Sequence, residues 1–428
     1  MRILFTFFAL FGPFSLAQQP DPLLSENPKH QQKWVDSIYQ SMSLDQKIGQ
    51  LFTPMVFSKK DEDHFNEIKN LIEKYHIGGI IFSLGSPFKQ LQWLNEFQSI
   101  SKVPLMISMD AEWGVAMRLD SVLAFPWNMT LGAIKDNTVI RRIGRRMGEQ
   151  ERILGVHMSY APVLDINTNP ENPIIGNRSF GEDPKRVADK GVALMKGHHD
   201  AGILTSGKHF PGHGDTAKDS HKTLPTVNFD RFRLENTEIY PFKKAIEQGL
   251  SSVMIAHLNV PALTFSTDPT SLSSAVVTKY LKQNIGFNGL AVTDALNMKG
   301  AVTNNSNKNI DLLALLAGND ILLISQDIPQ GIEKIKNAYN NLPIVKRRVE
   351  ESVKKILKAK YKVGLTEKIN IDTNNLQARL NTRKDTLLIE EAYSKSITLI
   401  KNDNQLLPLD PQTTYAHIKL GGHQSDVF

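Results

Sequence analysis

Short apolar runs recur along this chain, and each is separated from the next by a segment with helical periodicity. Most of the runs are continuously apolar rather than alternating, which is typical of parallel strands covered on both faces. They lie at residues 76–82, 104–110, 153–167, 201–210, 251–260, 289–296 and 319–325. Repeated strand–helix units of this kind predict a TIM-type (β/α)8 barrel, with a doubly wound open sheet as the alternative.

The N-terminus has the pattern of a secretory signal peptide. Arg2 precedes an apolar run over residues 3–14, and Ser15-Leu16-Ala17 provides a small-residue cleavage site before the polar stretch "QQPDPLL". The apolar run is too short for a comfortable membrane span. We therefore expect cleavage after Ala17, and a periplasmic or secreted mature chain without a transmembrane segment. A buried N-terminal helix is the alternative.

The composition is that of an ordinary globular protein, with 41% hydrophobic and 22% charged residues. The net charge of +6 is spread along the chain, without the dense Lys/Arg block of a nucleic-acid surface, so we expect no nucleic-acid partner. The chain contains no cysteine, which excludes disulfides, thiol chemistry and a lipid-modified cysteine. Export without disulfides fits a bacterial periplasm or exterior.

Polar residues follow several of the apolar runs at the point where each run ends. They are Asp110, Glu112, Asp165, Asn167, Lys208, His209, His257, Asn259 and Asp294, and Arg178 stands in the later loop "NPIIGNRSFGEDP". In a barrel of this type, the carboxyl ends of the strands and the loops after them build the active site. A single strand-end aspartate often only caps the next helix, but a series of such residues indicates a site.

The stretch "KHFPGHGDTAKDSH", residues 208–221, is the densest group of titratable side chains in the chain. Pro211, Gly212 and Gly214 exclude a regular helix there. The histidine and aspartate intervals do not match a helical H-E-x-x-H site, a Cys/His finger or a hard-cation loop. No phosphate-binding glycine loop follows a strand either. We therefore expect neither a metal nor a cofactor.

Acid–base chemistry with a carboxylate nucleophile fits these residues better. Asp294 ends the apolar strand "GLAVTD", which would hold it rigidly, whereas Asp219 and His221 are two residues apart on a glycine-bearing loop. An aspartate beside a histidine orients the imidazole and raises its basicity, which gives a proton shuttle near neutral pH. A rigid carboxylate with a separately mounted acid/base is the machinery of a retaining glycosidase.

At these residues the chain resembles the bacterial family 3 β-N-acetylglucosaminidases. The motifs "MSLDQKIGQLF", "IGGIIF", "KHFPGHGDTAKDSH" and "VTDALNM" occur in the order that this family shows, and the resemblance covers roughly residues 35 to 410. The long loop motif is highly specific. It argues against the β-glucosidases and β-xylosidases of the same family, which generally take their acid/base from a carboxylate elsewhere.

The resemblance implies a role for each matching position. Asp294 matches the nucleophile that forms a covalent glycosyl-enzyme, and Asp219 with His221 matches the dyad that protonates the leaving oxygen and then activates water. Further positions match substrate-binding residues: Asp110, which grips distal hydroxyls, together with Arg178, Lys208 and His209. We also expect His257 near the substrate, and we expect His213 to hold the loop turn.

The resemblance also implies a domain organisation. Residues 18–365 are expected to form the barrel and residues 366–395 a linker. "SITLIKNDNQLLPLD", from residue 396, resembles the start of the α/β sandwich domain that many members carry, so residues 396–428 would be the incomplete beginning of that domain. The expected partner is a carbohydrate with terminal β-linked GlcNAc, from peptidoglycan fragments or chitooligosaccharides. A family 3 β-glucosidase or β-xylosidase, phosphate in place of water as acceptor, and a non-catalytic sugar-binding barrel remain as alternatives.

Overall fold

The computed structural model describes residues 21–216, 223–264, 266–302, 309–368, 370–405, 407–412 and 414. The chain divides into two compact units, with the boundary after Ser396. The expected signal peptide, residues 1–17, and the expected dyad, Asp219 and His221, lie outside the described residues. All other predicted site residues belong to the first unit.

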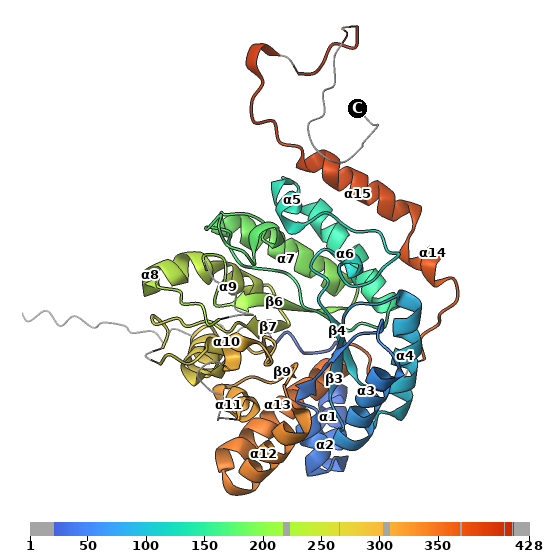
Figure 1. The fold of residues 1–428 in the computed structure, drawn as a ribbon, viewed down its shortest axis with the longest axis vertical. Helices are drawn as coiled ribbons and strands as arrows, with labels where there is room; N and C mark the ends of the chain where they lie inside the picture. Colours follow the sequence, from blue (N-terminus) through green and yellow to red (C-terminus); the bar gives the residue numbers. More distant parts are fainter. Residues whose placement is uncertain are drawn as a thin grey trace, which may run out of the picture. The chain divides into compact units, whose positions relative to one another are not determined.

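The first unit is built around short parallel strands, seen at the centre of Figure 1. They are β1 (Phe52–Thr53), β2 (Met55–Val56), β3 (Gly79–Phe82), β4 (Met106–Met109), β5 (Met158–Ser159), β6 (Leu204–Phe210), β7 (Ser252–Ile255), β8 (Leu290–Thr293) and β9 (Leu322–Leu323). Strands β2 to β8 pair in sequence order, and β1 pairs with β9. A bridge between Val292 and Ile321 joins β8 to the residue before β9.

These pairings close the sheet into a barrel. Only Pro54 separates β1 from β2, so the two act as one strand that pairs with β9 before the proline and with β3 after it. Proline lacks the N–H that would continue the ladder, which explains the change of partner at this point. With this interrupted strand counted once, the described part of the chain holds eight parallel barrel strands, and the predicted TIM-type barrel is confirmed.

Helices surround these strands (Figure 1). The α-helices are α1 (Pro28–Ser41), α2 (Leu44–Gly49), α3 (Glu62–Tyr75), α4 (Pro87–Ile100), α5 (Asn128–Ala133), α6 (Asn137–Ile153), α7 (Pro184–Asp200), α8 (Arg231–Arg233), α9 (Tyr240–Glu247), α10 (Lys299–Val302), α11 (Ile310–Ala317), α12 (Ile328–Asn341), α13 (Pro343–Lys362), α14 (Leu376–Leu380) and α15 (Arg383–Ser396). The other helical turns are η1 (Val115–Met117), η2 (Gly176–Arg178), η3 (Leu234–Glu238), η4 (Thr270–Leu272), η5 (Ala275–Asn284) and η6 (Asp403–Gln405). None of the described helices combines the length and apolar character needed to cross a membrane.

Local sequence explains where several helices begin. Ser43 and Gln46 form a capping box at the start of α2, in which each side chain accepts a hydrogen bond from the other residue's backbone N–H. Helices α1, α4 and α7 begin with an Asn, Ser or Asp cap followed directly by proline, at Asn27, Ser86 and Asp183. A side-chain acceptor satisfies a free N–H of the first turn, and proline is tolerated there because its missing N–H has no helical partner.

The expected strand at 153–167 is much shorter in the structure. Only Met158–Ser159 forms a regular strand, β5. Pro162 has no N–H to donate, and the chain beyond it meets β6 at a single bridge between Val163 and Lys208. The segment still runs beside β6 as far as Leu164, whose N–H donates to the carbonyl of Lys208 at 2.7 Å. It thereby carries Asp165 to the end of β6.

The segment predicted as a linker, residues 366–395, contains α14 and most of α15 and belongs to the first unit. Arg146 of α6 donates to both carboxylate oxygens of Asp385, at 2.5 and 3.0 Å, and Asp385 is buried. Gln150 of α6 also donates to the carbonyl of Leu380 at 2.7 Å. In the second unit, the described residues include the short turn η6. That residues 396–428 begin an α/β domain stays a prediction.

Candidate active site

A pocket of about 420 Å³ opens among residues that follow the barrel strands. Its lining divides into two groups. The titratable group consists of Asp110, Glu112, Arg118, Arg178, Lys208, His209, His213 and Asp294. The apolar group consists of Met55, Ile81, Met117, Ile174, Met254, Ala295, Met298, Leu323 and Ile324. Apolar walls with convergent polar groups are typical of small-molecule sites, and the number of charged side chains here suits a polar ligand.

Lys208, near the end of β6, lies at the centre of the titratable group. Its Nζ is 2.8 Å from Oδ1 of Asp110 and 2.7 Å from Oε1 of Glu112, so one ammonium bridges two carboxylates that follow β4. Lys208 and Glu112 are buried, and Asp110 is also held by Arg118, whose Nη2 is 2.8 Å from Oδ2. Ion pairs taken out of water in this way are strongly directional and fix the geometry of the pocket floor.

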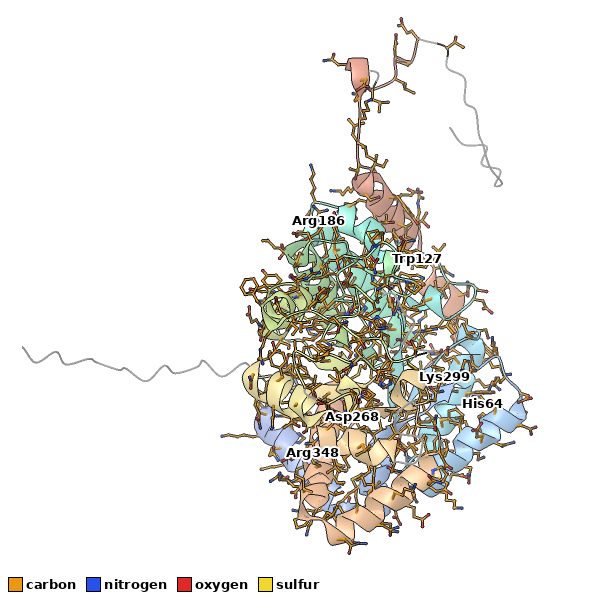
Figure 2. All side chains as sticks on the ribbon, turned by 60° about the vertical axis from the view of Figure 1, so that its left-hand side comes forward. His64, Trp127, Arg186, Asp268, Lys299 and Arg348 are labelled. Carbon is orange, nitrogen blue, oxygen red and sulfur yellow. The ribbon has the colours of Figure 1, made fainter. Side chains whose placement is uncertain are left out.

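Arg178, in the turn η2, reaches the same cluster from a different loop. Its Nε and Nη2 donate to the two oxygens of Glu112 at 2.9 and 2.7 Å, which is a bidentate pair. The turn itself is held by Asn128, whose side chain donates to the carbonyl of Arg178 at 2.8 Å. Figure 2 labels the neighbouring residue Trp127, which stacks on Trp113 with ring centroids 4.2 Å apart.

The ion pairs outweigh burial in setting the charge of the two carboxylates. Burial alone would raise the pKa of Glu112, but the charges of Lys208 and Arg178 hold that pKa well below its usual range. Burial likewise opposes ionisation of Asp110, and Lys208 and then Arg118 lower its pKa. Burial lowers the pKa of Arg178, but the Glu112 carboxylate raises it above its usual range. Both acids are therefore ionised at neutral pH.

Asp165 supports the loop that follows β6 from behind. It is fully buried; its Oδ2 accepts from the backbone N–H of His209 at 3.1 Å and lies 2.7 Å from Nδ1 of that ring. Its Oδ1 accepts from the N–H of His213 at 2.7 Å. Burial raises the pKa of Asp165, but His209 and His213 together lower it below the ordinary value. Asn172 completes the support by donating to the carbonyls of His213 and Gly214.

Asp294 lies just beyond β8 and lines the pocket. Its N–H donates to the carbonyl of Ile255 at 2.9 Å, and its Oδ1 accepts from the N–H of Ala295 at 2.8 Å. His257 is buried behind it rather than lining the pocket: Nε2 donates to the carbonyl of Ala295 at 3.0 Å, and Nδ1 lies 2.7 Å from the hydroxyl of Ser271. His257 therefore holds the chain next to Asp294.

The structure brings Asp110, Arg178, Lys208, His209 and Asp294 together in one pocket. His213, which we expected to be structural, also lines the pocket, and its Nδ1 lies 2.6 Å from the hydroxyl of Thr216 in its own loop. Asp219 and His221 belong to the residues that are not described.

Three residues without an assigned role in the sequence prediction join the cluster: Glu112, Arg118 and Asp165. Two of them, Glu112 and Asp165, stand at strand ends, which is a usable signal. Arg118 lies eight positions after Asp110 on an irregular turn, and no sequence motif predicts the contact between them. Across the residues that the structure describes, no group of three or more His, Asp or Glu side chains is arranged to hold a metal ion.

Comparison with known proteins identifies the family to which the chain belongs. Residues 43–359 match the N-terminal domain of glycosyl hydrolase family 3. A relative from Pseudoalteromonas piscicida, named beta-hexosaminidase A, is 29% identical over 391 residues, covering 84% of this chain and 65% of the relative. The chain thus spans a little less than two thirds of that protein's length.

Two solved structures are similar over most of the chain. A glycoside hydrolase family 3 beta-N-acetylglucosaminidase from Paenibacillus sp. str. FPU-7 is 35% identical with a TM-score of 0.78, covering 85% of this chain and 70% of that one. Beta-glucoside phosphorylase BglX, bound to 2FGlc, is 26% identical with a TM-score of 0.83, covering 92% of this chain and 72% of that one.

Proposed function

The chain belongs to glycosyl hydrolase family 3, and we propose that it is a retaining, exo-acting β-N-acetylglucosaminidase that removes terminal β-linked GlcNAc. The names of two similar proteins, beta-hexosaminidase A and a beta-N-acetylglucosaminidase, support this activity and this sugar. The expected signal peptide suggests an exported enzyme that acts on peptidoglycan fragments or chitooligosaccharides.

The observation that carries the proposal is the position of Asp294 in the same small pocket as the charged cluster. A volume of about 420 Å³ is near the lower end of the range for ligand sites, which suits a single terminal sugar. Asp110, Lys208 and Arg178 offer the charged donors and acceptors that hydroxyl groups bind. Because these side chains already bond one another, they are positioned before the sugar arrives, which reduces the entropy lost on binding.

In the proposed reaction, a carboxylate oxygen of Asp294 attacks the anomeric carbon while the glycosidic C–O bond breaks. His221, oriented by Asp219, donates its proton to the leaving oxygen. A water molecule then attacks the same carbon, His221 takes one proton from it, and the ester bond to Asp294 breaks. Two displacements at one carbon return the sugar with its β configuration. A histidine that titrates near neutral pH can serve in both steps.

The test uses the full chain and two chromogenic substrates, p-nitrophenyl β-N-acetylglucosaminide and p-nitrophenyl β-glucoside. We expect preferential cleavage of the first substrate, and a loss of kcat of about 10⁴-fold or more in Asp294→Ala, because the nucleophile is removed. His221→Ala should slow cleavage of substrates with poor leaving groups most. Asp189→Ala, which removes an exposed carboxylate paired with Lys185 on α7, is the matched control and should keep full activity.

Two results would contradict parts of the proposal separately. NMR of the first-formed sugar should show the β anomer, and an α anomer would exclude the covalent mechanism. Binding of GlcNAc without cleavage of either substrate would favour a non-catalytic sugar-binding barrel.

A second candidate follows from the similarity to beta-glucoside phosphorylase BglX. If phosphate replaces water in the second step, its oxygen attacks the anomeric carbon and a sugar 1-phosphate leaves. Comparing products in phosphate and in a phosphate-free buffer distinguishes the two acceptors. Faster cleavage of the glucoside would favour the β-glucosidase or β-xylosidase alternative.

A further inference from the structure

We infer that Asp165 is a positioning residue that fixes the tautomer of His209, so that Nε2 of this ring is a hydrogen-bond acceptor at the pocket. The inference rests on the proposed function only in taking a sugar hydroxyl as the group that Nε2 receives. It assigns a role to a buried carboxylate that does not itself line the pocket.

The first step is the hydrogen-bond inventory of Asp165. Its carboxylate has no hydrogen to give, and it faces two backbone N–H donors, those of His209 and His213. The third group at the carboxylate is Nδ1 of His209, 2.7 Å from Oδ2. Because an ionised carboxylate only accepts, Nδ1 must carry the proton that lies between them.

The second step concerns the other ring nitrogen. Nε2 of His209 lies 3.3 Å from Nη2 of Arg178, and a guanidinium only donates. If Nε2 carried a proton, its N–H would face the N–H of Arg178, which is unfavourable. If Nε2 carries a lone pair instead, it accepts a hydrogen bond from Arg178. Asp165 and Arg178 therefore both stabilise the same tautomer of His209, the one with its proton on Nδ1.

The third step is the consequence for binding. His209 lines the pocket, and its side chain is 9% exposed, so part of the ring is accessible to a ligand. Lys208 and Arg178 can only donate, so a sugar hydroxyl that accepts from one of them still needs an acceptor for its own proton. Nε2 of His209 has one lone pair, so it becomes that acceptor when the sugar hydroxyl replaces its 3.3 Å contact with Arg178, and it adds no negative charge beside Asp294.

A direct test is ¹⁵N NMR of the histidine side chains in the full chain at neutral pH, with the His209 signals assigned from their absence in His209→Gln. We expect a protonated shift at Nδ1 and an unprotonated shift at Nε2. A protonated Nε2 in the unmodified protein would overturn the inference, whatever any variant does.

The variant Asp165→Asn tests the cause. A carboxamide has one acceptor oxygen and one donor group, so it must lose at least one of the three hydrogen bonds. We expect a second His209 tautomer to become populated, and kcat/KM for the β-N-acetylglucosaminide to fall about 10-fold or more, since bonds to charged groups are the strong ones. The loss should fall mainly on KM, because a hydroxyl contact is made in the ground state and the transition state alike.

Ser179→Ala is the matched control, because the hydroxyl of Ser179 donates to the main-chain carbonyl of Asp165 at 2.7 Å and does not touch the carboxylate. It should leave both the tautomer and KM unchanged. Asp165→Asn with an unaltered tautomer and an unaltered KM would contradict the inference. If the protein cleaves no glycoside, the proposed function fails, while the tautomer measurement still decides this inference.

Discussion

Glu112 shows how much of the site depends on one side chain. It is the only described carboxylate with ion pairs to both Lys208 and Arg178, and it lines the pocket with almost no exposed surface. Removing its charge leaves two buried cations with fewer partners, which is costly because they have already lost their water.

We therefore predict that Glu112→Gln lowers the free energy of unfolding by about 3–5 kcal/mol and raises KM by displacing Lys208 and Arg178. Urea unfolding and steady-state kinetics would measure the two effects. Glu149→Gln is the control, since Glu149 makes only exposed or half-exposed pairs with Arg145 and Arg146. A Glu112→Gln protein as stable and as active as the parent would show that the cluster is dispensable.

Glu151, on α6, is a second buried acid with different surroundings. Burial raises its pKa to about 8, and one oxygen accepts from the hydroxyl of Ser159 at 2.6 Å. Its other oxygen has no hydrogen-bond partner among the described residues, and Nε2 of His198 lies 3.8 Å away. Burial lowers the pKa of His198 to about 4, so both groups are neutral at pH 7.

This acid makes stability depend on pH. The folded protein binds the Glu151 proton more tightly than the unfolded chain, whose glutamate has a pKa of about 4.5, so the contribution to stability is lost as pH rises from that value to about 8. We predict that Glu151→Gln removes this loss: its Tm should exceed that of the parent at pH 8–9 by more than at pH 5. Calorimetry across that range measures it, and a constant Tm difference would refute the assignment.

At the scale of elements, α14 and α15 pack apolar side chains such as Leu380 and Ala392 into the core, and polar contacts add to this packing. Asp385 near the start of α15 is 1% exposed and pairs with Arg146 of α6. Further along the same helix, Glu391 pairs with Arg142 of α6 but is partly exposed. The same two helices are therefore joined by one buried ion pair, Arg146 with Asp385, and one more exposed ion pair, Arg142 with Glu391, which can be compared directly.

We predict that Asp385→Ala loosens both helices and lowers the free energy of unfolding by about 3 kcal/mol or more, because it leaves Arg146 half-buried without its main partner. Limited proteolysis between residues 366 and 382 should become faster. Glu391→Ala should cost less than about 1 kcal/mol. An equal loss in the free energy of unfolding for the two variants would show that burial does not make the Asp385 ion pair more important than the Glu391 ion pair.

The elements also show what the sequence could and could not predict. Continuous apolar runs such as 289–296 predicted the buried strands, because this signal is local. The first barrel strand escaped notice because Pro54 divides it into two pairs of residues. Contacts such as Asp165 with His209 escaped for another reason: they join segments 44 residues apart, whose meeting depends on the closed barrel.

At the scale of the whole molecule, the described site residues all belong to the first unit, and so does the packing of α14 and α15. We predict that a chain ending at Ser396 keeps the Tm of the full chain and its kcat/KM on the p-nitrophenyl substrate. Loss of activity with an unchanged Tm would show that residues 397–428 contribute to the site. Loss of both would show that they support the first unit.

The pairing of β1 with β9 means that the barrel can close only after its last strand has formed. Phe52 pairs with Leu322, so this edge of the first strand stays unpaired until nearly the whole barrel is available for folding. Until then, the unpaired strand edge is open to pairing with other chains. Pairing β2 with β3 in the meantime protects half of that strand. Within the first strand, Phe52 and Thr53 are thus the last residues to gain their pairing partners, and they are the part of it most exposed to chaperone binding or aggregation.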